Sequence, residues 1–292
     1  MNKNMNELES EQVSPRLSQA EKGAIFLSMH HEDEAFIIPN PWDIGTARLL
    51  AQLGYRALAT TSAGYAFSIG QRDNTIDRET MIRHVRDIVE ATNLPVSADL
   101  ENGFGDSPAT VAETIQLSSK VGLVGASIED ATNQKGNPIY EFELAVDRIR
   151  AAADVKHSLA HPFVLTGRTE NYLVGRPDLK DTIKRLQAYQ EAGADVLYAP
   201  GVTSKDEIAA IVRSVDRPVN VVMGLQGVKL SLAELSEIGV KRISVGSALS
   251  RAALGAFLRA ANEMLEKGTF NFADDAVSYA EISSMFVAGD GN

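Results

Sequence analysis

The sequence contains no cysteine. Disulfide bonds, thiolate metal sites and cysteine nucleophiles are therefore excluded, and nothing suggests export. Long apolar runs are also missing, since no stretch reaches the roughly 18 residues that a membrane-spanning helix needs. The first twenty residues are polar and lack the apolar core of a signal peptide. Together these absences predict a cytoplasmic protein.

Positive charge is in short supply, with 28 Lys and Arg against 39 Asp and Glu, for a formal net charge of −11. Such a chain repels phosphate backbones and anionic lipid, so we expect neither nucleic acid nor membranes as partners. An acidic enzyme that binds a small acid needs a local arginine or a metal ion to reverse the sign of the charge at its site.

Eight short aliphatic runs alternate with helical patterns of about 10–15 residues, which is typical of βα units and a parallel sheet. The runs are 35–39, 56–61, 95–99, 125–128, 163–166, 195–198, 218–222 and 242–245. The length of 292 residues suits an α/β barrel built as one unit. No G-x-G-x-x-G motif follows the first run, which disfavours an open dinucleotide-binding sheet. The pattern predicts a (β/α)8 TIM-type barrel.

The barrel is expected to form a single domain over residues 19–292, preceded by a polar N-terminal tail at residues 1–18. A C-terminal helical extension is predicted from about residue 248, with a long helix over 248–267 and a shorter amphipathic helix over 274–286. Extra helices at this place usually form a subunit contact or cap the barrel.

Three acidic residues follow neighbouring predicted strands, where barrel enzymes place their active sites. Asp99 and Glu101 are two residues apart, so their side chains share one face while the chain stays extended. Glu129 ends the next strand, at a spacing of about 4.8 Å. Carboxylates this close repel by roughly 4 kcal/mol per pair at an effective dielectric near 20, so they bind either protons or a cation. Oxygen ligands favour Mg²⁺, with Mn²⁺ next. The alternative is that these acids are helix caps and solvated loop residues.

Arg168 ends the fifth run, where its planar fork suits a substrate carboxylate. The alternative is a salt bridge to Glu129 or Glu170 at the barrel rim. Hydroxyls and backbone N–H groups in the small-residue turn after the second run suit an anionic group. From this turn we take Thr61 and Ser62 as catalytic candidates and Ala63 and Gly64 as substrate-binding candidates.

Other candidates lie in loops. Asp73 follows the second run and can reach a metal-bound water, so we include it among the catalytic candidates. Asp43 is expected mainly to cap a helix over 44–53, and Trp42 to pack, although both stay candidates for substrate binding. Asn220, in the seventh run, is a further substrate-binding candidate. No histidine or lysine ends a predicted strand, which disfavours a Schiff-base aldolase.

Taken together, these motifs resemble the phosphoenolpyruvate mutase/isocitrate lyase superfamily over residues 39–261. The resemblance rests on Asn40-Pro41-Trp42-Asp43, Asp73, Asp99-x-Glu101-x-Gly103-Phe104-Gly105, Ile128-Glu129-Asp130, Gly167-Arg168-Thr169 and Val245-Gly246-Ser247. It implies a barrel whose eighth helix is exchanged between subunits of a dimer or of a homotetramer formed as a dimer of dimers.

The resemblance also implies Mg²⁺ held, largely through water, by Asp99, Glu101 and Glu129, with Asp73 nearby. Arg168 then binds a substrate carboxylate, and the turn at Thr61-Ser62 contributes backbone N–H groups.

Three departures from the family pattern bear on the activity. Isocitrate and methylisocitrate lyases carry a catalytic cysteine in a Lys-x-Cys-Gly-His loop after strand four, which this chain lacks. In the corresponding loop, residues 131–138, Asn133 or Asn137 is similar to the loop asparagine of the phosphonomutases, although the surrounding motif is missing, and Asn133 is a further substrate-binding candidate. Glu101 also replaces a commoner aspartate, and Thr61-Ser62 replaces a usual Ser-Gly.

These features predict an Mg²⁺-dependent lyase or decarboxylase that cleaves a C–C bond of a small α-keto or α-hydroxy acid through an enolate-like intermediate. One alternative is a P–C bond enzyme of the phosphonomutase or phosphonopyruvate hydrolase type. Another is a barrel that binds metabolites without catalysis, which the intact carboxylate cluster disfavours.

Overall fold

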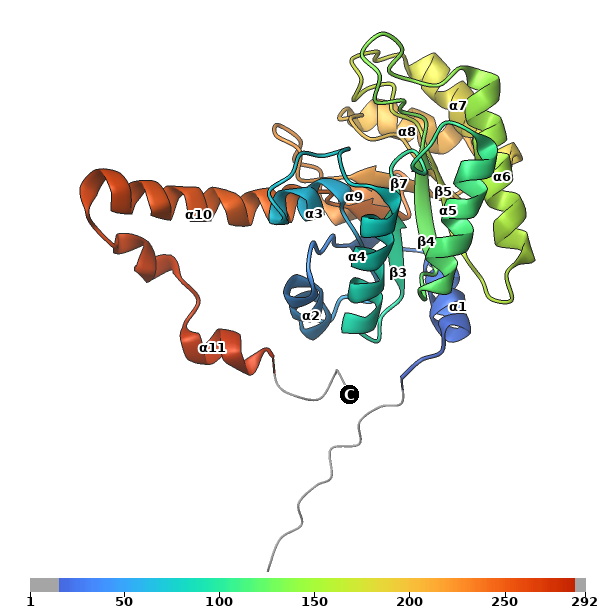
Figure 1. The fold of residues 1–292 in the computed structure, drawn as a ribbon. Coiled ribbons are helices and arrows are strands. Elements are labelled where there is room, and N and C mark those ends of the chain that lie inside the picture. Colours follow the sequence, from blue (N-terminus) through green and yellow to red (C-terminus); the bar gives the residue numbers. More distant parts are fainter. Residues whose placement is uncertain (1–15, 287–292) are drawn as a thin grey trace, which may run out of the picture.

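The aliphatic runs form eight parallel strands in a computed structural model that describes residues 16–286 (Figure 1). They are β1 (Phe36–Ile38), β2 (Leu58–Ala59), β3 (Val96–Asp99), β4 (Gly125–Glu129), β5 (Val164–Arg168), β6 (Val196–Tyr198), β7 (Val219–Val222) and β8 (Arg242–Ser244). Their order in the sheet is β1-β8-β7-β6-β5-β4-β3-β2. Between β1 and β2, the backbone N–H of Ala59 donates to the carbonyl of Pro39 at 3.0 Å. The barrel is therefore nearly closed, and the predicted (β/α)8 fold is confirmed.

Helices follow the strands and cover the outside of the barrel. They are α2 (Ile44–Gln52), α3 (Ser62–Ser68), α4 (Arg78–Ala91), α5 (Pro108–Lys120), α6 (Phe142–Ser158), α7 (Leu179–Glu191), α8 (Lys205–Ser214) and α9 (Leu232–Glu237). Most begin at a polar cap whose side chain accepts a hydrogen bond from a backbone N–H in the first turn. These caps include Asp43, Thr61, Asp77, Ser107, Asp178, Ser204 and Ser231. Capping therefore fixes the residue at which most of these helices begin.

A helix that the sequence analysis did not assign, α1 (Gln19–Met29), closes the N-terminal end of the barrel. Its Phe26 and Met29 are fully buried in a cluster with interior strand residues such as Val164. A Cβ atom at Gly125 would lie 2.8 Å from the Phe26 ring, so glycine there makes room for this helix. Residues 1–15 of the predicted tail lie outside the described residues. Arg16 contacts the barrel, donating to the carbonyl of Glu90 at 2.9 Å.

The C-terminal extension leaves the barrel as the helix α10 (Ala248–Lys267), which matches the predicted range (Figure 1). The predicted helix over 274–286 is shorter in the structure, because an extended residue, Ala276, and the cap Ser278 divide the segment. The two parts are the 3₁₀ helix η1 (Asn271–Asp275) and α11 (Tyr279–Ser284). Among residues 16–286, no helix combines the length and apolar character that crossing a membrane would require.

Candidate active site

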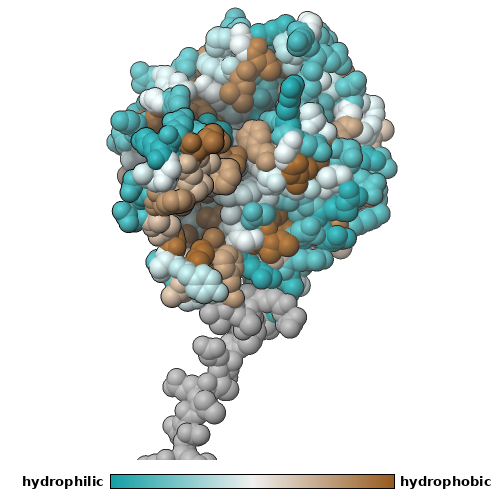
Figure 2. Space-filling model, turned by 60° about the vertical axis from the view of Figure 1, so that its left-hand side comes forward, coloured by the Kyte–Doolittle hydropathy of each residue, from teal (hydrophilic) through white to brown (hydrophobic). Residues whose placement is uncertain are grey.

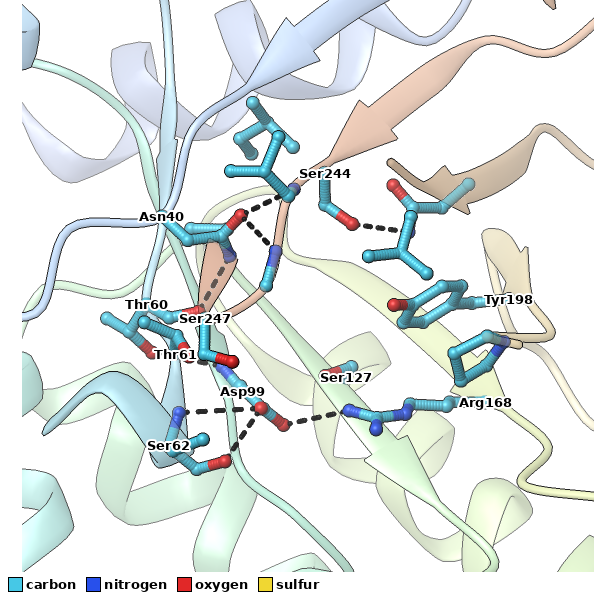
Figure 3. Close-up of a pocket in the computed structure, with 18 of the residues that line it drawn as sticks. Asn40, Thr60, Thr61, Ser62, Asp99, Ser127, Arg168, Tyr198, Ser244 and Ser247 are labelled. Carbon is cyan, nitrogen blue, oxygen red and sulfur yellow. Dashed lines mark hydrogen bonds and ion pairs between the residues drawn. The ribbon is translucent and has the colours of Figure 1, made fainter. Parts of the chain in front are cut away.

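A cavity of about 220 Å³ opens at the C-terminal ends of the strands (Figure 3). Barrel enzymes place their active sites at this end. Among the side chains that line the cavity are Asn40, Thr60, Thr61, Ser62, Asp73, Asp99, Arg168, Tyr198, Asn220, Arg242 and Ser244. They come from β3, β5, β6, β7 and β8 and from the loops after β1 and β2.

Arg168, the last residue of β5, contacts three carboxylates. Its Nη1 atom lies 3.3 Å from Asp99 Oδ1 and 3.2 Å from Glu129 Oε2. Its Nε atom donates to Glu170 Oε1 at 2.5 Å. Burial raises the pKa of Glu129, and the positive charge of Arg168 opposes that rise. The salt bridges that the sequence analysis held open for Arg168 are therefore present, and the same guanidinium also lines the cavity.

Glu101 lies beyond the end of β3, and its backbone is strained. The strand stops at Asp99, and Glu101 adopts a left-handed φ of 49°, so the alternation of an extended chain does not reach it. Its side chain is buried, and Oε1 has no hydrogen-bond partner within residues 16–286. Burial, followed by the charges of Asp99 and Asp73, raises the pKa of Glu101 to about 8. A buried carboxyl oxygen without a partner suits a cation or an ordered water.

The acidic side chains fit a hydrated divalent cation better than a closed cage of protein ligands. The Ser62 hydroxyl lies 3.0 Å from Asp99 Oδ2 and 3.2 Å from Asp73 Oδ1, so these two acids share one neighbour. In the part of the chain that the structure describes, no three acidic or histidine side chains converge tightly enough to form a ready-made metal site. Mg²⁺ usually keeps several waters and takes only one or two carboxylates. The unpartnered oxygen of Glu101 and the oxygen-only donor set are consistent with such an ion.

The turn after β2 is ordered by its own hydroxyl groups. Thr61 caps α3, because its Oγ1 atom accepts from the Gly64 N–H at 3.2 Å. The Ser62 N–H points at Asp99 Oδ2, 3.5 Å away. Thr61, Ser62 and Ala63 line the cavity, whereas Gly64 does not. A Cβ atom at Gly64 would lie 2.5 Å from the Thr61 methyl group, so this glycine is needed for packing.

Like Gly64, three further predicted substrate-binding residues do not line the cavity. Asp43 forms a capping box with Thr46 at the start of α2, as expected for a cap. Trp42 borders a separate groove beside Leu254 of α10. Asn133 is exposed in a small hairpin held by a bridge between residues 131 and 139. Within residues 16–286, no hydrogen bond or ion pair links these three side chains to the acidic cluster.

Sequence reasoning missed several residues that shape the cavity. Asn40 ties the rim together, since its Oδ1 atom accepts from the N–H groups of Val245 and Gly246 at 2.9 and 3.0 Å. The Tyr198 ring lies 5.3 Å from the Arg168 guanidinium, and Arg242 lines the cavity from β8. In the strand register, Tyr198 lies beside Arg168, and Arg242 lies beside Asn220. The sequence signal that could have identified Tyr198 and Arg242 was the presence of polar residues within the later, otherwise aliphatic strands.

Known proteins resemble this chain in sequence and in fold. A family model described as phosphoenolpyruvate phosphomutase matches residues 26–265. The 2-methylisocitrate lyase of Escherichia coli is 35% identical over 195 residues, which cover 61% of this chain and 64% of that protein. The structure of a candidate lyase/mutase from Burkholderia cenocepacia is 62% identical, with a TM-score of 0.91, and covers 94% of this chain and 98% of that one.

A more distant structure is that of oxaloacetate acetylhydrolase with its product oxalate. It is 26% identical, has a TM-score of 0.79, and covers 92% of this chain and 93% of that one. The family model spans most of the chain, and the barrel is the fold that the sequence motifs led us to expect. The chain belongs to the phosphoenolpyruvate mutase/isocitrate lyase superfamily of enzymes.

Proposed function

We propose that the protein is a Mg²⁺-dependent lyase that cleaves a C–C bond of a small 2-oxo or 2-hydroxy acid through an enolate-like intermediate. One observation carries the proposal: the carboxylate of Asp99 and the guanidinium of Arg168 meet at 3.3 Å on the wall of a small cavity. This arrangement sets a cation-binding group beside an anion-binding group. Relatives named for methylisocitrate and for oxaloacetate support the proposed substrate class.

The side chains around the cavity have distinct tasks in this reaction. A divalent ion held by Asp99, which lines the cavity, and by Glu101 and Glu129, which are buried and do not line it, would supply positive charge where an oxyanion develops. Arg168 would hold the substrate carboxylate with its planar fork, and the Thr61–Ser62 turn would orient the reacting end. No cysteine, histidine or lysine lines the cavity among the described residues. Asp73, which lies beside the Ser62 hydroxyl, is therefore our candidate for proton transfer.

Cleavage of a P–C bond is the second candidate function. The family model that matches residues 26–265 is described as a phosphomutase, which favours this alternative. A phosphonate also carries negative charge at the position where a carboxylate would sit, so the same cation and arginine would bind it. The chemistry of the bond that breaks separates the two candidates.

The test is a product assay with oxaloacetate, 2-alkylmalates and phosphonopyruvate, each with Mg²⁺ and with a chelator. We expect Mg²⁺-dependent release of a 2-oxo acid or oxalate from at least one carboxylic substrate. Asp99→Asn should abolish it, whereas Asp147→Asn, which changes an exposed acid on α6, should not. Release of phosphate from phosphonopyruvate alone would favour the second candidate. Turnover that persists in the chelator would refute the metal assignment.

We also propose that α10 is exchanged between two copies of the chain, within a dimer or a dimer of dimers. Only Ser250 of this helix is buried, while Phe257 and Leu265 are 68% and 84% exposed. Figure 2 shows apolar side chains gathered on the side of the molecule from which α10 projects. Sedimentation analysis should show a dimer or tetramer, and Phe257→Asp should shift it towards monomer, unlike Glu266→Gln. A monomeric wild-type protein would contradict the proposal.

A further inference from the structure

The cavity continues from its mouth into the interior of the barrel. Barrel interiors are usually filled by bulky branched side chains. Here the interior positions that face the cavity include Ala59, Ser97, Ser127 and Ser244, which are all small. Strands β2, β3, β4 and β8 therefore leave open, polar space between the mouth of the cavity and the barrel interior.

At the inner end of this space lies Arg242, the first residue of β8, which is only 5% exposed. All the partners that the structure gives it are neutral. Its Nε atom donates to Asn220 Oδ1 at 2.9 Å, and its Nη2 atom to Thr166 Oγ1 at 2.9 Å. Its Nη1 atom lies 3.3 Å from Nε2 of His30.

His30 is itself uncharged. Its Nδ1 atom lies 2.8 Å from the carbonyl oxygen of Phe26, which makes Nδ1 the donor and leaves Nε2 free to accept from Arg242. Burial, followed by the charge of Arg242, lowers the pKa of His30 to about 3. No ion pair joins Arg242 to any carboxylate within residues 16–286, whereas Arg168 has three. A buried cation without an anion is costly unless neutral groups satisfy it, as backbone carbonyls do for Arg148. Arg242 differs from Arg148 because it lines a cavity that an anion can enter.

The two arginines belong to one polar row on the inner wall. The strand register aligns Arg168 with Tyr198, Tyr198 with Asn220, and Asn220 with Arg242. They are therefore three strand spacings apart, each about 4.8 Å, around the curved wall. All four residues of this row line the same cavity. A ligand with one acidic group can meet one guanidinium, whereas a ligand with two can meet both.

We infer that Arg242, together with Asn220 and Ser244, forms a second anion subsite, which takes the far acidic group of the substrate. The ligand that this subsite selects is a small diacid whose second acidic group meets Arg242 rather than Arg251, the third arginine that lines the cavity. The inference rests on the proposed function only in assigning the first acidic group to the Arg168 end of the cavity. The competing explanation is that Arg242 only fastens α1 to the barrel through His30.

The test is calorimetric binding of pyruvate, malonate and succinate in the presence of Mg²⁺. Because hydrogen bonds to a buried charge are at stake, we expect the wild-type protein to bind at least one diacid about 10- to 100-fold more tightly than pyruvate. Arg242→Met should remove that advantage and leave pyruvate binding little changed. Arg150→Met, which alters an exposed arginine on α6, is the matched control and should change neither.

A second variant guards against misfolding of the first. Asn220→Asp puts a carboxylate of the same shape beside Arg242, where it neutralises the guanidinium without emptying the site. This variant should melt at or above the wild-type temperature and still lose the preference for diacids. A wild-type protein without that preference, or two variants that keep it, would overturn the subsite.

The subsite and the proposed reaction can fail separately. Diacid binding that depends on Arg242, in a protein that cleaves none of the tested substrates, would support the subsite and refute the lyase. Cleavage of diacids at an unchanged KM in both variants would support the lyase and refute the subsite.

Discussion

Replacing Glu101 by glutamine should stabilise the metal-free protein and weaken its binding of Mg²⁺. Glu101 is buried, one of its oxygens has no partner among the described residues, and its backbone is held at a left-handed φ of 49°. Burial raises its pKa to about 8 from 4.5. The folded state therefore disfavours the ionised form of Glu101, and glutamine removes this free-energy cost because it cannot ionise.

The magnitude follows from linkage between folding and proton binding. Between pH 4.5 and about 8 the unfolded chain has lost the Glu101 proton while the folded chain retains it, so stability falls as the pH rises through this window. At 1.36 kcal/mol per pKa unit, the cost at pH 7 is about 3 kcal/mol. Glu101→Gln should recover up to this amount at pH 7, and nothing below pH 4.5. With Mg²⁺ bound, the wild-type protein should be more stable than Glu101→Gln, because the ion stabilises only the ionised side chain.

Urea unfolding of both proteins from pH 4 to 8.5, with Mg²⁺ and with a chelator, measures these differences. Glu143→Gln is the matched control, because it neutralises an exposed glutamate at the start of α6 and should give nearly equal stability across the range. Equal stability of wild type and Glu101→Gln at pH 7 in the chelator would refute the claim that the Glu101 environment opposes charge. Equal Mg²⁺ affinity would remove Glu101 from the metal site.

Three further predictions concern the support of the site. Arg168→Lys should lower kcat/KM, with a loss of about 2–4 kcal/mol of transition-state stabilisation, because an ammonium cannot hold a carboxylate at two points. A variant with the wild-type kcat/KM would show that Arg168 has only a structural role. Arg148 is buried and donates to the carbonyls of Gly105 and Asp106 at 2.6 and 2.7 Å. Arg148→Met should therefore lower the free energy of unfolding in urea by about 3 kcal/mol and weaken Mg²⁺ binding. Unchanged stability would show that these hydrogen bonds do not hold the loop after β3. Shortening the 133–137 hairpin tip should impair turnover yet leave Mg²⁺-dependent deuterium exchange at the methyl group of pyruvate partly intact, as NMR can show; no exchange in the intact enzyme would argue against a pyruvate enolate.

The strands could be predicted because each is an aliphatic run, and several follow a boundary set by proline or glycine. Pro95 and Pro218 precede β3 and β7, and Gly54 ends the α2 turn with a φ of 87°. The helix α1 escaped prediction because its apolar side chains fill the barrel end rather than forming the usual stripe against the outside of the sheet. The final segment was predicted as one helix because its amphipathic pattern continues across the break near Ala276.

The acidic cluster could be located from strand ends, but its internal geometry could not. The parallel register pairs Glu129 with Arg168 on the neighbouring strand. Both Asp99 and Glu129 therefore lie within reach of the same arginine. The orientation of Glu101 depends on a backbone reversal immediately after β3, which the expectation of continued alternation did not include. Asn133 illustrates the opposite error, since a loop position chosen by analogy lies at an exposed hairpin tip in this chain.

The isolation of Arg242 is a property of the assembled wall, and no local pattern reveals it. Its partners come from three separate segments, through Asn220 of β7, Thr166 of β5 and His30 after α1. Had any of these been an acid, the guanidinium would be paired and the inner cavity electrically neutral. Of the three arginines that line the cavity, Arg168 is paired with acids, Arg251 lies at the start of α10, and Arg242 is buried without an acidic partner among the described residues, in a chain whose net charge is −11. An anion that enters this acidic protein therefore finds uncompensated positive charge at the inner end of the cavity, so this end favours the second charge of a diacid over a neutral tail.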